Sequence, residues 1–237
     1  MSENTIFVKK YDEVDGNLGI NEREFLRYAG YLGLPESMDE SVREIYSQVI
    51  REMKGAFSYQ VCYRRMEVTW ENGMPKFALE TDSKDLAKCL QRSNEVILFA
   101  ATIGLEIDRR IAKYQRFSPT KALLLQAYGA ERVETLCNVF CKEIRQQAET
   151  EGLRCTPRFS PGYGDLPLET QKEVFRLLDC HRKIGVALND SLLMTPSKSV
   201  TAMFGLGKDV CLVREHKCEN CDKKECEFRA SDANEYK

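Results

Sequence analysis

EVILFAAT, residues 95–102, is the segment on which the fold prediction depends most. It is short and almost wholly apolar, so it predicts a β-strand that is buried on both faces. The segment after Ile103-Gly104, LEIDRRIAKY, carries apolar residues at helical spacing. Ser118-Pro119 then begins the longest helical pattern, which extends to about Gly152, because proline is favoured in the first turn of a helix. We therefore expect a buried strand followed by two helices at the centre of the fold.

Further strands and helices are predicted on both sides of this segment. Before it come a short alternating run at Ile6 and Val8, helices at 21–32 and 42–53, strands at 57–66, 67–70 and 77–80 with a turn at Asn72-Gly73, and a short helix from Ser83. After the long helix come a helix at 169–179 and strands at 192–194 and 200–204. The irregular order favours an α+β fold, with an antiparallel or mixed sheet flanked by helices, over a parallel doubly wound fold.

Three segments are distinguished along the chain. Residues 1–79 are expected to supply helices and strands that pack on the main domain, residues 80–207 to form the main domain, and residues 208–237 to form a small cysteine-rich tail. A chain of 237 residues is long enough for one large domain with such an appendage.

The composition argues against several classes of function. Lysine and arginine number 35 and aspartate and glutamate 37, so the net charge is −2 and a nucleic-acid partner is not expected. The longest apolar runs, such as 96–103, fall short of the roughly 20 residues that span a bilayer, and residues 1–16 lack the apolar core of a signal peptide. We therefore expect a cytoplasmic protein without a membrane partner, in which the ten cysteines are thiols, metal ligands or redox groups.

The segment CTPRFSPGYGDLP, residues 155–167, has an unusual composition for a linker. Its three prolines stiffen the backbone, and Gly162 and Gly164 permit positive φ or the close approach of a ligand. Arg158 could hold a carboxylate with two parallel hydrogen bonds, and Tyr163 offers a flat ring and a hydroxyl. From composition alone, the segment is either a small-ligand site or a rigid surface loop.

The run from Arg158 to Tyr163 matches the signature R-x-x-x-G-Y, and its surroundings extend the match. ATIGLEIDRRI and GAERVETL lie before it, and LLDCHRKIGVALNDSLLMTPSKSVTAMFGLG lies after it. Over about residues 80–207 the chain resembles the activation domain of cobalamin-dependent methionine synthase. The chain looks like a stand-alone form of that domain, and the C-terminal cysteines look like an addition to it.

The resemblance implies binding of S-adenosylmethionine (AdoMet). By analogy with the family, Arg158 contacts the carboxylate of the ligand, and the loop backbone at Ser160, Gly162 and Tyr163 holds its adenosine and methionine parts. A family glutamate on the long helix corresponds to Glu134, with Glu131 as a rival, and a carboxylate there would favour the ammonium and sulfonium groups of AdoMet. Two family features have no evident counterpart, namely a pair of tyrosines after the Ser-Val strand and an early aspartate.

The function implied by the resemblance is reactivation of cobalamin-dependent methionine synthase. In that reaction, cob(II)alamin on a methionine synthase subunit or another corrinoid protein takes up one electron from a donor. AdoMet then supplies a methyl group, which gives methylcobalamin. One alternative is a non-catalytic, metal-binding scaffold or assembly protein that no longer binds AdoMet. Another is an AdoMet-dependent methyltransferase with a different acceptor, although the glycine-rich loop of the large methyltransferase class is absent. With two histidines in the chain, a Ser-His-Asp or multi-histidine site is not expected.

Four cysteines near the C-terminus form a possible metal site: Cys211, Cys218, Cys221 and Cys226. Their spacing is C-x6-C-x2-C-x4-C, and the surrounding residues are polar. Four thiolates suit zinc or an iron–sulfur cluster, while a redox dithiol or plain free thiols remain the alternatives. An iron–sulfur cluster here would offer a source for the activating electron. The remaining cysteines are expected to be structural.

Overall fold

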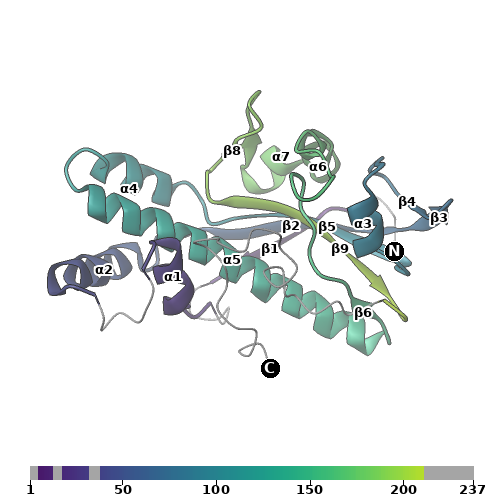
Figure 1. Ribbon diagram of the computed structural model, residues 1–237, viewed down its shortest axis with the longest axis horizontal. Helices are drawn as coiled ribbons and strands as arrows, with labels where there is room; N and C mark the ends of the chain where they lie inside the picture. Colours follow the sequence, from purple (N-terminus) through teal and green to yellow (C-terminus); the bar gives the residue numbers. More distant parts are fainter. Residues whose placement is uncertain (1–4, 13–17, 32–37, 211–237) are drawn as a thin grey trace.

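The computed structural model describes residues 5–12, 18–31 and 38–210. Its centre is a five-stranded antiparallel sheet with the spatial order β1-β2-β5-β9-β6 (Figure 1). The strands are β1 (Phe7–Tyr11), β2 (Tyr59–Glu67), β5 (Glu95–Thr102), β9 (Ser199–Gly207) and β6 (Arg154–Cys155). The α+β fold and the antiparallel sheet are therefore confirmed.

Strand β5 lies in the middle of the sheet and is covered on both faces, as its apolar run predicts. The side chains of Ile97, Phe99 and Ala101 belong to one hydrophobic core. The alternate residues Val96, Leu98 and Ala100 belong to a second core on the opposite face. Because successive side chains of a strand point to opposite faces, one continuous apolar run serves both cores.

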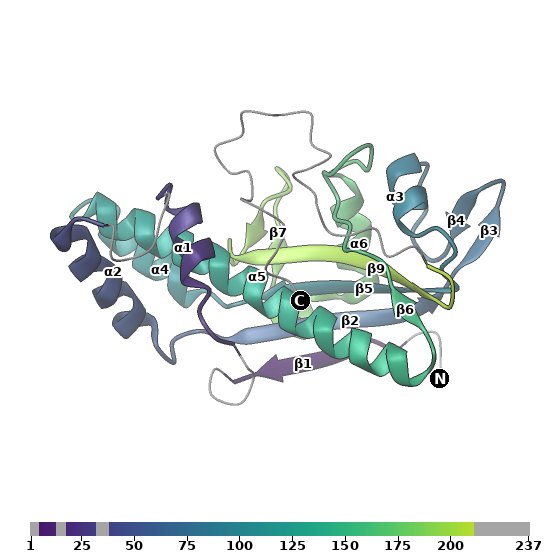
Figure 2. The same cartoon turned by 60° about the horizontal axis from the view of Figure 1, so that its bottom comes forward.

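Four helices cover the first face: α1 (Glu22–Tyr28), α2 (Glu40–Met53), α4 (Glu106–Tyr114) and α5 (Pro119–Thr150). The longest, α5, runs along the sheet (Figure 2) and buries Leu136 and Phe140 against it. The other three pack around the N-terminal half of α5. This helix thus connects most of the first core.

Three short helices cover the second face: α3 (Lys84–Cys89), α6 (Thr170–Leu178) and α7 (Cys180–Ile184). A hairpin of β3 (Thr69–Glu71) and β4 (Met74–Lys76) lies beside α3, and a second small hairpin pairs β7 (Ala187–Leu188) with β8 (Met194–Thr195). The segment that carries Arg158 crosses from the first face to the second, between β6 and α6.

Several predicted boundaries were wrong, and local backbone geometry explains two of them. Helix α1 ends at Tyr28 because Gly30 has a φ of +80° and the chain closes with hydrogen bonds from Gly30 N to Arg27 O and from Tyr31 N to Leu26 O. The strand predicted at 77–80 is β4 at 74–76, because Asn72 and Gly73 both have positive φ and form a two-residue turn. The strand predicted at 192–194 is β8, at 194–195.

Candidate functional site

The segment from Thr156 to Leu168, here called the signature loop, continues along the edge of β9 after β6 ends. Phe159 and Met203 exchange two backbone hydrogen bonds of 2.8 Å, and Thr156 N donates to Gly205 O at 2.9 Å. The hydroxyl of Thr156 in turn accepts from Gly205 N at 2.8 Å. The first part of the loop is therefore held in place by main-chain contacts with the sheet.

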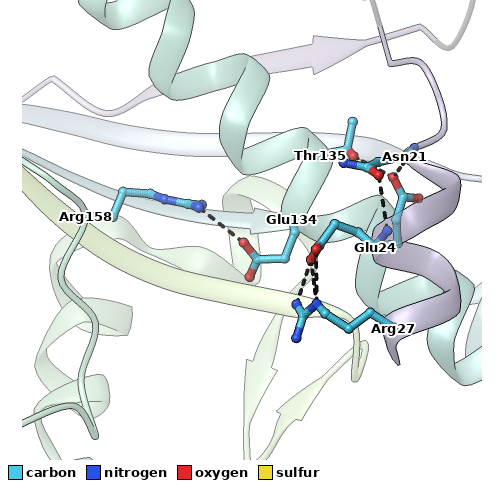
Figure 3. A network of polar contacts seen from close by, with 7 residues as sticks. Asn21, Glu24, Arg27, Glu134, Thr135 and Arg158 are labelled. Atoms are coloured by element: carbon cyan, nitrogen blue, oxygen red, sulfur yellow. Dashed lines mark hydrogen bonds and ion pairs between the residues drawn. The ribbon is translucent and has the colours of Figure 1, made fainter. Parts of the chain in front are cut away.

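Arg158 reaches from this anchored segment to helix α5. Its Nη2 lies 2.9 Å from Asn138 Oδ1. The same nitrogen lies 3.2 Å from Glu134 Oε2 (Figure 3). The Arg158 side chain is 19% exposed and that of Glu134 is 40% exposed, so the pair lies at the surface and remains accessible to a ligand. Behind it, burial raises the pKa of the Cys137 thiol, against the opposing effect of Arg158, and the thiol stays protonated at neutral pH.

Glu131 lies in a different environment from Glu134, although both are on α5. Its side chain is 1% exposed and forms a salt bridge of 2.5 Å with Arg132, which is 2% exposed. Glu131 also accepts hydrogen bonds from Asn21 N and the hydroxyl of Thr135. Arg132 donates to the carbonyls of Leu18 and Gly19. Of the two glutamates, Glu134 faces Arg158, whereas Glu131 fastens the segment before α1 to α5.

Helix α1 borders Glu134 on the side away from the signature loop. Burial, together with the charge of Glu134, raises the pKa of Tyr28 to about 12. The guanidinium of Arg27 lies 4.5 Å from the centre of the Tyr28 ring and forms a salt bridge of 2.6 Å with Glu24. Tyr28 and Asn138 were not among the sequence-predicted site residues. For Asn138 a signal existed, since it lies four residues after Glu134 and so on the same face of the helix.

The rest of the signature loop is a series of tight turns. Gly162 has a φ of +88° and its N–H donates to Leu166 O, while Tyr163 N donates to Ser160 O. The Tyr163 side chain is 62% exposed. The predicted residues Ser160, Gly162 and Tyr163 thus lie together in this loop, where their backbone hydrogen bonds close its turns.

Helix α3 fixes the far end of the loop. The Asp165 carboxylate accepts hydrogen bonds from the Ser83 hydroxyl and from the backbone N–H groups of Lys84 and Asp85. These hydrogen bonds, that of Ser83 first, lower the pKa of Asp165. The thiol of Cys89 donates to Pro157 O at 3.3 Å. The loop is therefore tied to the sheet at one end and to α3 at the other.

The four cysteines predicted to bind a metal, Cys211, Cys218, Cys221 and Cys226, lie outside the described residues. Within residues 5–12, 18–31 and 38–210, no group of three or more histidine, cysteine, aspartate or glutamate side chains is arranged to hold a metal ion. The six cysteines in these ranges are free thiols, and four of them are buried. No helix in the same ranges is long and apolar enough to cross a membrane.

The sequence model of a family described as the vitamin B12 dependent methionine synthase, activation domain, matches residues 84–228, and the chain belongs to this family. The match extends beyond residue 207 and includes the positions of the four C-terminal cysteines.

A solved structure supports the same fold. The MetH reactivation domain, crystallised with AdoHcy, aligns with a TM-score of 0.67 over 89% of this chain and 81% of that one, at 12% sequence identity. No curated protein sequence matches the chain.

Proposed function

We propose that this chain binds AdoMet between α5 and the signature loop and serves in the cytoplasm to reactivate cobalamin-dependent methionine synthase. The observation that carries the proposal is the position of Arg158, which the signature loop directs onto α5 beside Glu134. Family membership supports the proposal independently.

The charges of the site fit the amino-acid end of AdoMet. An α-amino acid carries a carboxylate and an ammonium group on one carbon, and Arg158 and Glu134 present a guanidinium and a carboxylate side by side. Their mutual ion pair lies at the surface and is partly exposed, and ion pairs at the surface contribute little stability. A ligand can therefore replace this pair with one charge-assisted contact to each residue at low cost.

AdoMet would supply a methyl group bound to a positively charged sulfur, for transfer to the cobalt of cobalamin on a partner corrinoid protein. The task of this chain is then to position its ligand, which can contribute roughly 7–11 kcal/mol to such a transfer. Arg158 and Glu134 would hold the amino-acid end, while the loop backbone at Ser160, Gly162 and Tyr163 would hold the rest. The hydrogen bonds of the loop to β9 and α3 suit that task, because they keep the contacts in fixed positions.

Calorimetric titration with AdoMet tests the binding step. Arg158→Ala is expected to weaken binding by about 2 kcal/mol or more, which is about 30-fold in Kd. Arg176→Ala is the matched control, because Arg176 forms an exposed ion pair with Glu173 on α6. Absence of binding by the unmodified chain would favour the scaffold alternative, and an unchanged Kd in Arg158→Ala would refute the proposed site.

A spectral assay tests the reaction. With a cobalamin-loaded methionine synthase subunit, a one-electron reductant and AdoMet, the chain is expected to accelerate formation of methylcobalamin. The acceleration should be lost in Arg158→Ala and retained in Arg176→Ala. AdoMet binding without any acceleration would instead favour a methyltransferase with another acceptor.

We also propose that Cys211, Cys218, Cys221 and Cys226 bind zinc or an iron–sulfur cluster. Their composition and spacing support a four-thiolate site. Iron and sulfide analysis of the anaerobically purified chain distinguishes the two metals. A cluster would make the tail a candidate source of the activating electron, whereas stoichiometric zinc without a visible chromophore would exclude that role.

A further inference from the structure

A second concave region lies away from the signature loop, between α3 and the β3–β4 hairpin. This groove, here called the α3–hairpin groove, has a volume of about 540 Å³, which is in the range of small-molecule sites. Figure 1 shows α3 and the hairpin next to each other at one end of the sheet. The lining residues are Trp70, Gly73, Met74, Lys84, Ala87, Lys88, Gln91 and Arg92.

The groove is positively charged although the chain as a whole is not. Lys84, Lys88 and Arg92 line it, no aspartate or glutamate does, and the net charge of the chain is −2. Within the described residues, none of these three side chains has a carboxylate partner in an ion pair. Asp85 and Asp165 lie nearby on the side of α3 that faces the signature loop, outside the groove lining. Three cations around a concave surface whose lining holds no carboxylate would attract an anion.

Arg92 occupies a position that is unfavourable for an arginine. Its φ is +66°, in the left-handed region, just after α3. Glycine takes up this conformation without strain at the ends of helices, whereas a residue with a Cβ does not. Strained residues of this kind are concentrated at functional sites. The backbone conformation therefore does not favour an arginine at position 92, whereas an anion bound in the groove would account for it.

The apolar part of the groove is fixed in position. The indole Nε1 of Trp70 donates to Ser93 O at 2.9 Å, which anchors the ring beside the segment that carries Arg92. Met74 and the buried Ala87 add further apolar surface. An anchored indole beside cationic side chains suits a flat ring that carries a negative charge.

We propose that the α3–hairpin groove binds a small anion with a flat aromatic body, of the size and charge of a mononucleotide. The aromatic body lies against Trp70, and the anionic group is bound by Lys84, Lys88 and Arg92. This site is separate from the one proposed between α5 and the signature loop. On α3 itself, the side chains of Asp85 and Cys89 and the backbone N–H of Lys84 contact the signature loop, whereas Lys84 and Lys88 line the groove.

Trp70 allows the proposal to be tested directly, because it is the only tryptophan in the chain and its fluorescence reports on the groove alone. Titration of the full chain with AMP is expected to give a saturable change in fluorescence, with a Kd roughly tenfold or more below that of inorganic phosphate. Adenosine, which lacks the anion, should give no saturation over the same range. Equal responses to AMP and adenosine, or no saturable response to AMP up to about 10 mM, would overturn the proposal.

Two variants and a control make the test specific. Arg92→Gly removes the cation and also relieves the positive φ, so the chain should remain at least as stable while its Kd for AMP rises roughly tenfold. The double variant Lys84→Gln/Lys88→Gln should weaken AMP binding similarly. The control is Lys172→Gln on α6, outside the groove, which should leave the Kd unchanged. Unchanged AMP binding in both groove variants would overturn the proposal. The proposal would also be overturned if an oligoglutamate peptide changed the fluorescence of Trp70 and AMP did not.

Discussion

At the residue scale, Glu131 and Glu134 show how burial separates two identical side chains that are three positions apart. Glu131 is shielded from water and is held by Arg132 and by the segment before α1, whereas Glu134 borders the proposed ligand site. Burial acts to lower the pKa of Arg132, but the hydrogen bond to Glu131 and the charge of Glu131 together outweigh that effect, and the pKa is raised. Arg132 therefore stays charged at neutral pH, with Glu131 as its counter-ion.

Glutamine substitution should distinguish the two residues. Glu131→Gln is expected to lower the free energy of unfolding by about 3 kcal/mol or more, because it leaves Arg132 charged and buried without its counter-ion. Glu134→Gln should change the free energy of unfolding by about 1 kcal/mol or less, since an ion pair at the surface contributes little, but should weaken AdoMet binding. Urea unfolding and calorimetry on both variants measure these effects. Equal losses of stability would contradict the structure.

Gly164 is the glycine of the signature loop with the least room. A Cβ at this position would lie 2.3 Å from Asp85 Oδ2, and its φ is +52°. Gly164→Ala is expected to lower the free energy of unfolding by about 1–3 kcal/mol, because the Asp85 side chain must move and the backbone is strained.

The matched control for this substitution is Gly185→Ala. Gly185 also has a positive φ, of +67°, but a Cβ added there would meet no atom within 4 Å. Its loss of stability, measured by urea unfolding, should come from backbone strain alone and be the smaller of the two. If Gly185→Ala cost as much as Gly164→Ala, the contact with Asp85 would not matter.

At the scale of elements, we expect the contact between α3 and the signature loop to weaken at acidic pH. Hydrogen bonds from Ser83 and from two backbone N–H groups lower the pKa of Asp165. A carboxylate whose pKa is lowered on folding stabilises the folded state fully above the ordinary value of about 3.9. That contribution is lost as the pH falls below this value and through the lowered pKa of the folded state.

Asp165→Asn should remove this part of the pH dependence. The free energy of unfolding, measured by urea at several pH values, should fall less steeply below about pH 4 in the variant than in the unmodified chain. Above that pH the variant should be the less stable of the two. Parallel curves for the two proteins would mean that Asp165 does not titrate in this contact.

Local signals were sufficient to predict some elements but not others. The apolar run of β5, the cap at Ser83 and Pro119 at the start of α5 each depend on neighbouring residues alone, and all three lie where they were predicted. The choice between Glu131 and Glu134 depends on which side of α5 meets the sheet and α1. Packing between distant segments decides that orientation, so it could not be predicted from the spacing of residues along α5.

At the scale of the whole molecule, the residues before the family match belong to the same sheet and the same core. The match begins at residue 84, yet β2 pairs with β5 over eight residues, and α1 and α2 pack on α5. A fragment of residues 80–237 would leave one edge of β5 unpaired and one side of α5 uncovered. Unpaired strand edges and exposed apolar faces promote aggregation.

We therefore expect the fragment of residues 80–237 to lack a cooperative unfolding transition. Near-ultraviolet circular dichroism during a urea titration measures this. The matched control is a fragment of residues 5–210, which retains all five strands and should unfold cooperatively. A sharp transition in the 80–237 fragment would show that the main domain folds without the N-terminal segment.

The backbone pairing of Phe159 with Met203 has a consequence for the kinetics of ligand exchange. A loop that opens like a lid must break its main-chain contacts, whereas here those contacts hold the residue next to Arg158 against β9. AdoMet should then enter and leave without waiting for slow backbone opening, because the side chains that must move rotate on the nanosecond scale. The amide protons of Phe159 and Met203 should accordingly exchange with solvent slowly, and equally slowly, with and without the ligand.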